Sequence, residues 1–139
     1  MEVLSKNDGL LTNIEIMCLL QGRQSQTRRD SPDFMNRNRI EADSIKFLSD
    51  SVINGTTVDM ATECFDALVK LKLGLTPAEL LQVSNHIPMS ECEIHMIIED
   101  AHERLIPEQF NAILAAVKEC YNITDEEEEE EEEDKDGEH

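Results

Sequence analysis

Residues 76–121 decide the fold of this chain and read TPAELLQVSNHIPMSECEIHMIIEDAHERLIPEQFNAILAAVKECY. Thr76 is followed three residues later by Glu79, and Ser90 is followed in the same way by Glu93. Each pair predicts a capping box, in which the hydroxyl and the carboxylate bind backbone N–H groups that a helix leaves free at its start. The stretch therefore predicts consecutive short helices.

The apolar residues around these starts have the spacing of helices. The last segment begins with Pro107, which suits a first helical position, and its apolar residues recur three and four apart. They are Phe110, Ile113, Leu114, Val117 and Tyr121. Residues 57–73 repeat this period, and Gly74 after them suits a left-handed helix end. Within residues 39–54 one helical face would carry Ile45, Leu48 and Val52.

Composition also favours helices. Hydrophobic residues make up 40% of the 139 residues, which is enough for a core, while aromatic residues make up only 4% and Trp is absent. A core of Leu, Ile, Val, Met and Ala suits helices better than sheets. Residues 40–121 contain no strand run and no glycine-rich phosphate loop. We therefore expect an all-α fold, with one helical bundle over residues 40–121.

The negative charge is concentrated at the C-terminal end. The chain has a net charge of −19, and residues 125–139 carry twelve acids and one base, a net of −11. Such a segment cannot bury apolar surface, so we expect residues 122–139 to be disordered. It could bind a basic partner or only keep the chain soluble. The other residues carry 19 acids and 11 bases, which argues against independent, non-specific binding to nucleic acid.

The sequence indicates a soluble intracellular protein. No secretory signal is recognisable at the start, and the longest apolar run, AILAAV, is too short to span a membrane. The four cysteines have no CxxC spacing, and we expect all of them to be small, reduced core residues. They are Cys18, Cys64, Cys92 and Cys120.

Four possible metal ligands lie in residues 90–105. They are Cys92, His95, Glu99 and His102. On one helix they would extend over about 15 Å, so at most two could share an ion, whereas structural zinc takes about four ligands. We therefore interpret them as surface side chains beside an apolar arc that faces the core. That arc comprises Ile94, Ile97, Ile98, Ala101 and Leu105. We predict no catalytic, metal-binding or cofactor-binding residues.

The N-terminal part has apolar residues but little core of its own. We expect residues 1–24 to dock on a partner, as a possible short strand plus a helix capped by Thr12 and Glu15. The alternative is that this segment folds back on the bundle. The predicted partner-binding residues are Val3, Leu4, Leu10, Leu11, Ile14 and Ile16.

Residues 25–39 are expected to be a polar linker. The surrounding stretch, residues 22–39, is rich in arginine and contains Gly, Pro and Ser. Its basic residues are Arg23, Arg28, Arg29, Arg37 and Arg39. They would line a solvated loop or contact an acidic partner or nucleic acid.

Three stretches resemble a known family. They are LLTNIEIMCLL (10–20), FDALVKLKLGLTPAELLQVSNHIP (65–88) and IEDAHERLIPEQFNAIL (98–114). In order and spacing they resemble the smaller stalk subunit of RNA polymerase III, also known in animals as the calcitonin-gene-related-peptide-receptor component. Its paralogue is the smaller stalk subunit of RNA polymerase II. One departure is Ile106, where we would expect a hydroxyl cap.

The resemblance implies an HRDC-like helical domain, like that first described in RecQ-type helicases and RNase D, in a non-catalytic nuclear subunit. It implies a heterodimer with a larger stalk subunit that carries an OB domain and makes most of the RNA contact. It also implies attachment to the polymerase core and support of initiation on small non-coding RNA genes, such as those for tRNA and 5S rRNA. For this support the stalk would contact the initiation factor that contains the TATA-binding protein.

Two alternatives stay open. The chain could be the equivalent subunit of another nuclear polymerase. The N-terminal stretch, MEVL (1–4) and LLTNIEIMCLL (10–20), and NHIP (85–88) favour polymerase III. It could instead be a free-standing helical adaptor or chaperone that binds basic proteins through its acidic tail.

Overall fold

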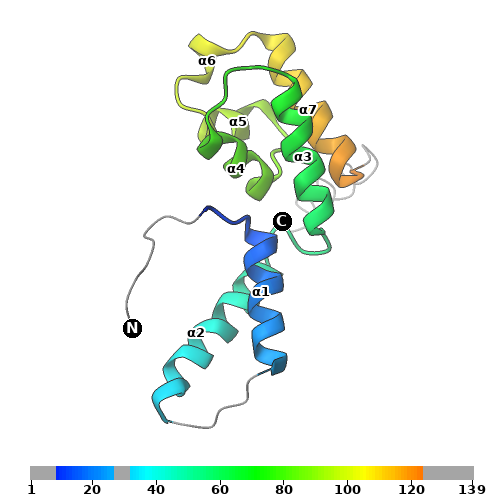
Figure 1. Cartoon of the computed structure of the whole chain (residues 1–139). Helices are drawn as coiled ribbons and strands as arrows, with labels where there is room; N and C mark the ends of the chain where they lie inside the picture. The colour runs from blue at the N-terminus through cyan, green and yellow to red at the C-terminus, as the bar shows by residue number, and fades with distance from the viewer. Residues whose placement is uncertain (1–8, 27–31, 124–139) are drawn as a thin grey trace, which may run out of the picture. The chain divides into compact units, whose positions relative to one another are not determined.

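The protein is seen in a computed structural model that describes residues 9–26 and 32–123. These residues are helical and contain no strand, so the expected all-α fold is confirmed (Figure 1). The helices are α1 (Asn13–Gln26), α2 (Pro32–Ser49), α3 (Val58–Lys70), α4 (Pro77–His86), α5 (Glu91–Ile97), α6 (Ala101–Arg104) and α7 (Pro107–Tyr121). The possible N-terminal strand before residue 9 and the expected disorder of the acidic tail from residue 124 lie outside the described residues. None of the described helices is long and apolar enough to cross a membrane.

The chain divides into two compact units, Met1–Val58 and Asp59–His139. In the first unit α1 and α2 pack side by side as a helical hairpin (Figure 1). The structure thus groups α2 with α1, whereas we expected residues 40–121 to form a single helical domain. The functional division of the chain stays a prediction.

The expected linker over residues 25–39 is largely helical. α1 continues to Gln26 and α2 begins at Pro32, so only residues 27–31 of the interval lie outside the description. Pro32 suits the first turn of a helix, and α2 then carries ion pairs four residues apart, Arg37 with Glu41 and Arg39 with Asp43. Such pairs stabilise a helix even when its composition is polar. The linker prediction did not take these pairs into account.

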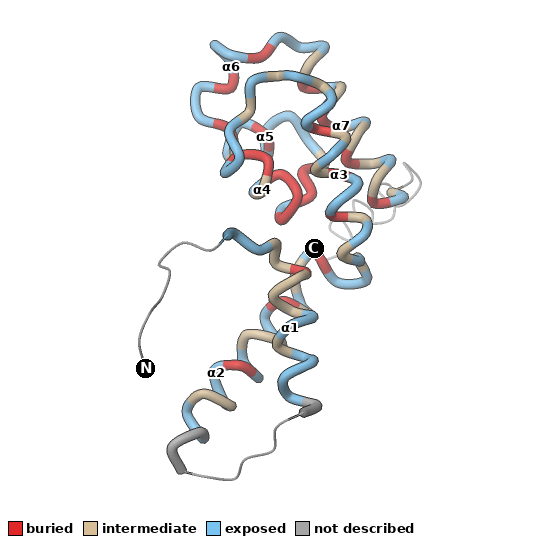
Figure 2. The backbone as a smooth tube through the Cα atoms, viewed as in Figure 1, coloured by how far each residue is buried: buried red, intermediate tan, exposed pale blue. Residues whose placement is uncertain are grey.

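The second unit builds its core from α3, α4, α5, α6 and α7 (Figure 2). Its buried apolar residues are Cys64, Leu68, Leu80, Val83, Ile87, Ile94, Ile98, Ala101, Leu105, Phe110, Ile113, Val117 and Tyr121. The three predicted capping boxes are confirmed, at Thr12–Glu15, Thr76–Glu79 and Ser90–Glu93. Gly74 has the predicted left-handed conformation, with φ +70°.

The single helix expected over residues 90–105 is interrupted between α5 and α6. Ile98 is extended, and Asp100 adopts a left-handed conformation with φ +50°. Aspartate tolerates this conformation better than most residues do. The turn keeps Ile98 and Leu105 in the core, where they are 1% and 5% exposed. The predicted apolar arc is thus buried, apart from the half-buried Ile97.

Two further expectations are wrong. We expected all four cysteines to be buried, but Cys18 and Cys92 are exposed and Cys120 is half-buried. Only Cys64 is fully buried, and burial raises the pKa of its thiol to about 12. Val52 does not share a helical face with Leu48, because α2 ends at Ser49 and Val52 is exposed in the turn that follows.

Candidate interaction surfaces

An apolar groove runs between α1 and α2 in the first unit. It is a shallow groove that is largely open to solvent, with a volume of about 450 Å³. Its lining residues are Asn13, Ile16, Ile40, Asp43, Ser44, Phe47 and Leu48. Phe47 is 74% exposed and Ile40 is 65% exposed, so two large apolar side chains at the groove face solvent. An exposed aromatic beside an apolar depression is typical of a protein-binding surface.

Helical spacing places the groove residues of α2 on one face. Ile40, Ser44 and Phe47 follow one another at intervals of four and three, and the Ser44 hydroxyl donates to the Ile40 carbonyl at 2.7 Å. Because that hydroxyl is bound to its own helix, it adds little polarity to the surface. The sequence prediction did not include Ile40 and Phe47. Their spacing indicates one helical face, but it does not show that a groove lies beside that face.

The predicted partner-binding residues have different surroundings. Val3 and Leu4 lie outside the described residues. Leu10 is 74% exposed, Leu11 is 47% exposed, and Ile16 lines the groove. The remaining residue of the prediction, Ile14, is 4% exposed and therefore buried in this structure. The structure thus brings Ile16 together with Ile40 and Phe47, while the partner-binding role itself stays a prediction.

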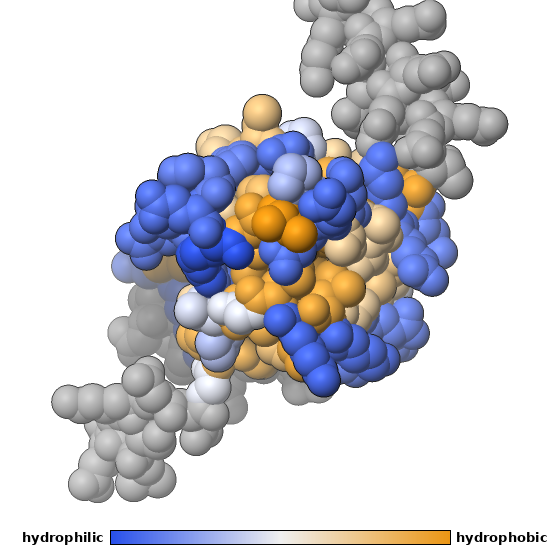
Figure 3. All heavy atoms as spheres, turned by 90° about the horizontal axis from the view of Figure 1, so that it is seen from above, coloured by the Kyte–Doolittle hydropathy of each residue, from blue (hydrophilic) through white to orange (hydrophobic). Residues whose placement is uncertain are grey.

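The second unit also exposes apolar side chains. Among its described residues, the exposed large apolar side chains are Val69, Met96 and Ile106. In Figure 3, apolar atoms gather at the centre of the face in view, and hydrophilic side chains surround them. Ile106 is the residue before α7, and it has no side chain that could cap the helix. Gln109 compensates in part, because its side-chain oxygen accepts from the Ile106 N–H at 3.0 Å.

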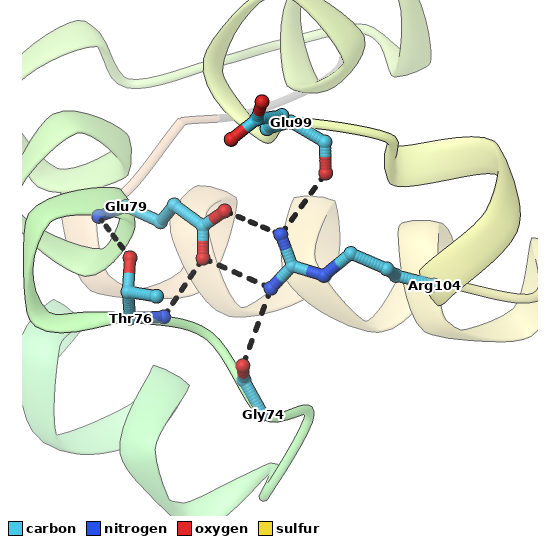
Figure 4. Close-up of polar contacts among 5 residues, drawn as sticks. All are labelled: Gly74, Thr76, Glu79, Glu99 and Arg104. Carbon is cyan, nitrogen blue, oxygen red and sulfur yellow. Dashed lines mark hydrogen bonds and ion pairs between the residues drawn. The ribbon is translucent and has the colours of Figure 1, made fainter.

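A polar clamp in the second unit is centred on Arg104 (Figure 4). Its guanidinium donates to both carboxylate oxygens of Glu79, to the Glu99 carbonyl at 3.0 Å and to the Gly74 carbonyl at 3.2 Å. The same carboxylate accepts from the Thr76 N–H at 2.7 Å. One arginine thus joins the turn after α3, the start of α4 and the connection before α6.

The electrostatics of the clamp are those of a structural ion pair. The hydrogen bonds from Arg104, aided by the Thr76 backbone, lower the pKa of Glu79 to about 2. Glu79 is 9% exposed, and a carboxylate in that position must be paired to remain charged. Its interactions join three segments of the second unit, so we assign it to the folding of that unit.

The histidine and cysteine stripe lies at the surface of the second unit. The ring of His95 lies against Phe110, with 4.8 Å between ring centroids, and 6.4 Å from the His102 ring. His95 Nε2 is 3.6 Å from a Glu91 carboxylate oxygen. Among residues 9–26 and 32–123 no three His, Cys, Asp or Glu side chains are placed to hold a metal ion together.

Comparison with known proteins places this fold in a family. The family model described as RNA polymerase Rpb4 matches residues 10–121. The chain is also similar to "DNA-directed RNA polymerase III subunit rpc9" of Dictyostelium discoideum, with 26% identity over 110 residues, which cover 76% of this chain and 81% of that protein. The family match covers both described units, from just before α1 to the end of α7. The chain therefore belongs to the RNA polymerase Rpb4 family.

Proposed function

We propose that this chain is a non-catalytic stalk subunit of RNA polymerase III. The observation that carries the proposal is the similarity to the polymerase III subunit of Dictyostelium, which extends over most of both chains. The family match over residues 10–121 supports the same assignment. The proposed location is the nucleus.

The groove of the first unit is the proposed contact with the larger stalk subunit. Phe47 and Ile40 would insert into that partner, and the exposed Leu10 and Leu11 would extend the contact toward the N-terminus. Aromatic anchors that become buried carry much of the binding energy in protein interfaces. Val3 and Leu4 would add to the same interface, by pairing with the partner's sheet as an extra strand.

Other proposed contacts follow from the assignment. The heterodimer would attach to the polymerase core and support initiation through the factor that contains the TATA-binding protein. RNA would be bound mainly by the OB domain of the larger subunit, because the present chain has a net charge of −19. An equivalent role in another nuclear polymerase is the main alternative within this class.

Affinity purification of the tagged full chain tests the assignment. We expect RNA polymerase III subunits in near-equal amounts, with the larger stalk subunit retained in high salt, because apolar contacts are little screened. Recovery of the subunits of another polymerase would shift the assignment to that enzyme. Recovery of basic proteins alone, abolished when residues 125–139 are deleted, would overturn it in favour of an acidic adaptor.

A further inference from the structure

An exposed threonine–proline pair lies at the start of α4. Residues 73–76 have no regular secondary structure and residues 76–78 are exposed, so Thr76 lies on a loop that solvent reaches. The backbone of Thr76 is extended, with φ −71° and ψ 156°, as expected for a residue before proline. Within the described ranges, Thr76 is the one serine or threonine that proline follows directly.

This pair has the features of a phosphorylation site. A protein kinase holds its target residue in an extended conformation, which Thr76 already has. Proline has no N–H to donate, so the matching enzymes are proline-directed kinases, which accept proline directly after the target residue. The Thr76 oxygen would attack the γ-phosphorus of ATP. The new O–P bond forms as the bond to the β-phosphate breaks, ADP leaves, and the hydroxyl proton passes to a base of the kinase.

The contacts of Thr76 connect it to the polar clamp. Its hydroxyl oxygen accepts from the Glu79 N–H at 3.2 Å, and its own N–H donates to the Glu79 carboxylate at 2.7 Å (Figure 4). The Arg104 guanidinium donates to both oxygens of the same carboxylate. A phosphate group on Thr76 would therefore lie beside the carboxylate on which the clamp depends.

The charges at this place are balanced only while Thr76 is unmodified. Arg104 carries one positive charge, and Glu79, which is 9% exposed, carries one negative charge. A phosphothreonine adds a charge of about −1.5 to −2 at pH 7, so it repels the carboxylate and competes with it for the guanidinium. The free N–H groups at the start of α4 favour the phosphate, but the loss of a partner by a buried charge is the larger effect.

We propose that Thr76 is a phosphorylation site for a proline-directed kinase, and that the phosphate group opens the polar clamp between Glu79 and Arg104. The turn after α3 and the connection before α6 would then lose the arginine that joins them. This inference goes beyond the proposed assembly role, because it assigns to the second unit a covalent modification that regulates its stability.

The first test is the incubation of the full chain with ATP and a purified proline-directed kinase of the mitogen-activated class, followed by peptide mass spectrometry. We expect phosphate on Thr76. Pro77→Ala should lower the initial rate of this modification by roughly tenfold or more, because the kinase pocket discriminates against the missing ring.

Ser31→Ala is the matched control for the site of modification. Ser31 and Pro32 form the other serine–proline or threonine–proline pair of the sequence. We expect this variant to be modified at Thr76 at an unchanged rate. Phosphate on Ser31 without phosphate on Thr76 would overturn the site, and so would a rate at Thr76 that Pro77→Ala does not change.

Thermal unfolding followed by circular dichroism tests the effect on the clamp. The phosphorylated chain should unfold at a midpoint lower by roughly 5 °C or more than the unmodified chain. In Arg104→Ala the clamp is already open, so phosphorylation should lower the midpoint by less than about half as much.

A second variant keeps this test decisive. If Arg104→Ala loses its helices, Glu79→Gln takes its place, because it removes the charge that the phosphate repels. An unchanged midpoint after phosphorylation of the unsubstituted chain would overturn the proposal, and so would an equal decrease in the variant. Neither test involves a polymerase, so the inference can fail independently of the proposed function.

Discussion

At the residue scale, the Arg104–Glu79 ion pair links stability to pH. Hydrogen bonds from Arg104 lower the pKa of Glu79 from 4.5 to about 2. A carboxyl group whose pKa is lowered on folding stabilises the folded state above its unfolded pKa, and this contribution disappears as the pH falls toward the folded pKa. The window of change is therefore from about pH 5 down to about pH 2.

Replacing Arg104 should remove this pH-dependent contribution. We expect Arg104→Ala to lower the free energy of unfolding at pH 7, because Glu79 would lose the main partner of its carboxylate while it stays in a buried position. The difference from the unmodified chain should shrink between pH 5 and pH 2, where Glu79 becomes protonated. Urea unfolding followed by circular dichroism at several pH values measures it. A difference that stays constant over this range would contradict the assigned role of the clamp.

A second prediction concerns the buried hydroxyl of Tyr121. It donates to the Ser84 carbonyl at 3.0 Å and lies 3.1 Å from the Ser84 hydroxyl. Tyr121→Phe would leave the carbonyl without this donor, so we expect the free energy of unfolding to fall by about 1–2 kcal/mol. Urea unfolding at pH 7 measures the change. Ser84→Ala removes only the weaker contact and should cost less; the reverse order would show that the Ser84 carbonyl is not the important acceptor.

At the element scale, the turn between α5 and α6 depends on the backbone of Asp100. Its φ of +50° is unfavourable for a β-branched residue. We expect Asp100→Val to lower the free energy of unfolding by roughly 1–2 kcal/mol. Asp100→Asn removes the same charge but tolerates the left-handed conformation, so it should stay close to the unmodified chain. Equal destabilisation of the two variants, measured by urea unfolding, would show that the charge matters and the conformation does not.

At the start of α7 we predict a substitution that stabilises the protein. Ile106 stands at the N-cap, is 57% exposed and cannot bind a backbone N–H with its side chain. Ile106→Ser should therefore stabilise the second unit by about 0.5–1 kcal/mol, because serine supplies the missing cap. Thermal unfolding would show a higher midpoint. Ile106→Ala is the control for the removal of apolar surface, and a rise of the same size in that variant would rule out capping as the cause.

The sequence predicted most of these elements, because capping and helical spacing are local. The Ser90–Glu93 box and the period of α7 needed no knowledge of the rest of the chain. Features that depend on tertiary packing were missed. The turn at Asp100 forms because Ile98 and Leu105 both reach the core. The spacing of apolar residues in the sequence does not indicate this break between α5 and α6.

The surfaces were predicted less well for the same reason. The groove forms only when two helices pack, so Phe47 could not be assigned to it from the spacing of α2 alone. The first residues of α2 were predicted as a linker because they are polar. That prediction left out the ion pairs four residues apart that support the helix. Cys18 is exposed although cysteine is usually buried, and nothing in its local sequence indicates this. The exposure of Cys92 agrees with its predicted position beside the apolar arc, and the general expectation of buried cysteines was wrong for it.

At the scale of the whole molecule, the chain combines a stable core with a surface that suits assembly. The second unit buries its apolar residues in one cluster, while the small first unit leaves Ile40 and Phe47 in solvent. A monomeric protein has little reason to expose such residues side by side at a groove. Assembly into a polymerase stalk would bury them, which is the central claim of this account.

Co-purification of groove variants tests that claim most directly. The tagged chain carrying Ile40→Asp and Phe47→Asp is compared with one carrying Met96→Asp, which alters an 86% exposed apolar residue of the second unit. The groove variant should retain at least about tenfold less of the larger polymerase III stalk subunit, since charges would replace buried anchors. Met96→Asp should retain the normal amount, and both variants should stay helical. Normal retention of the partner by the groove variant would contradict the account.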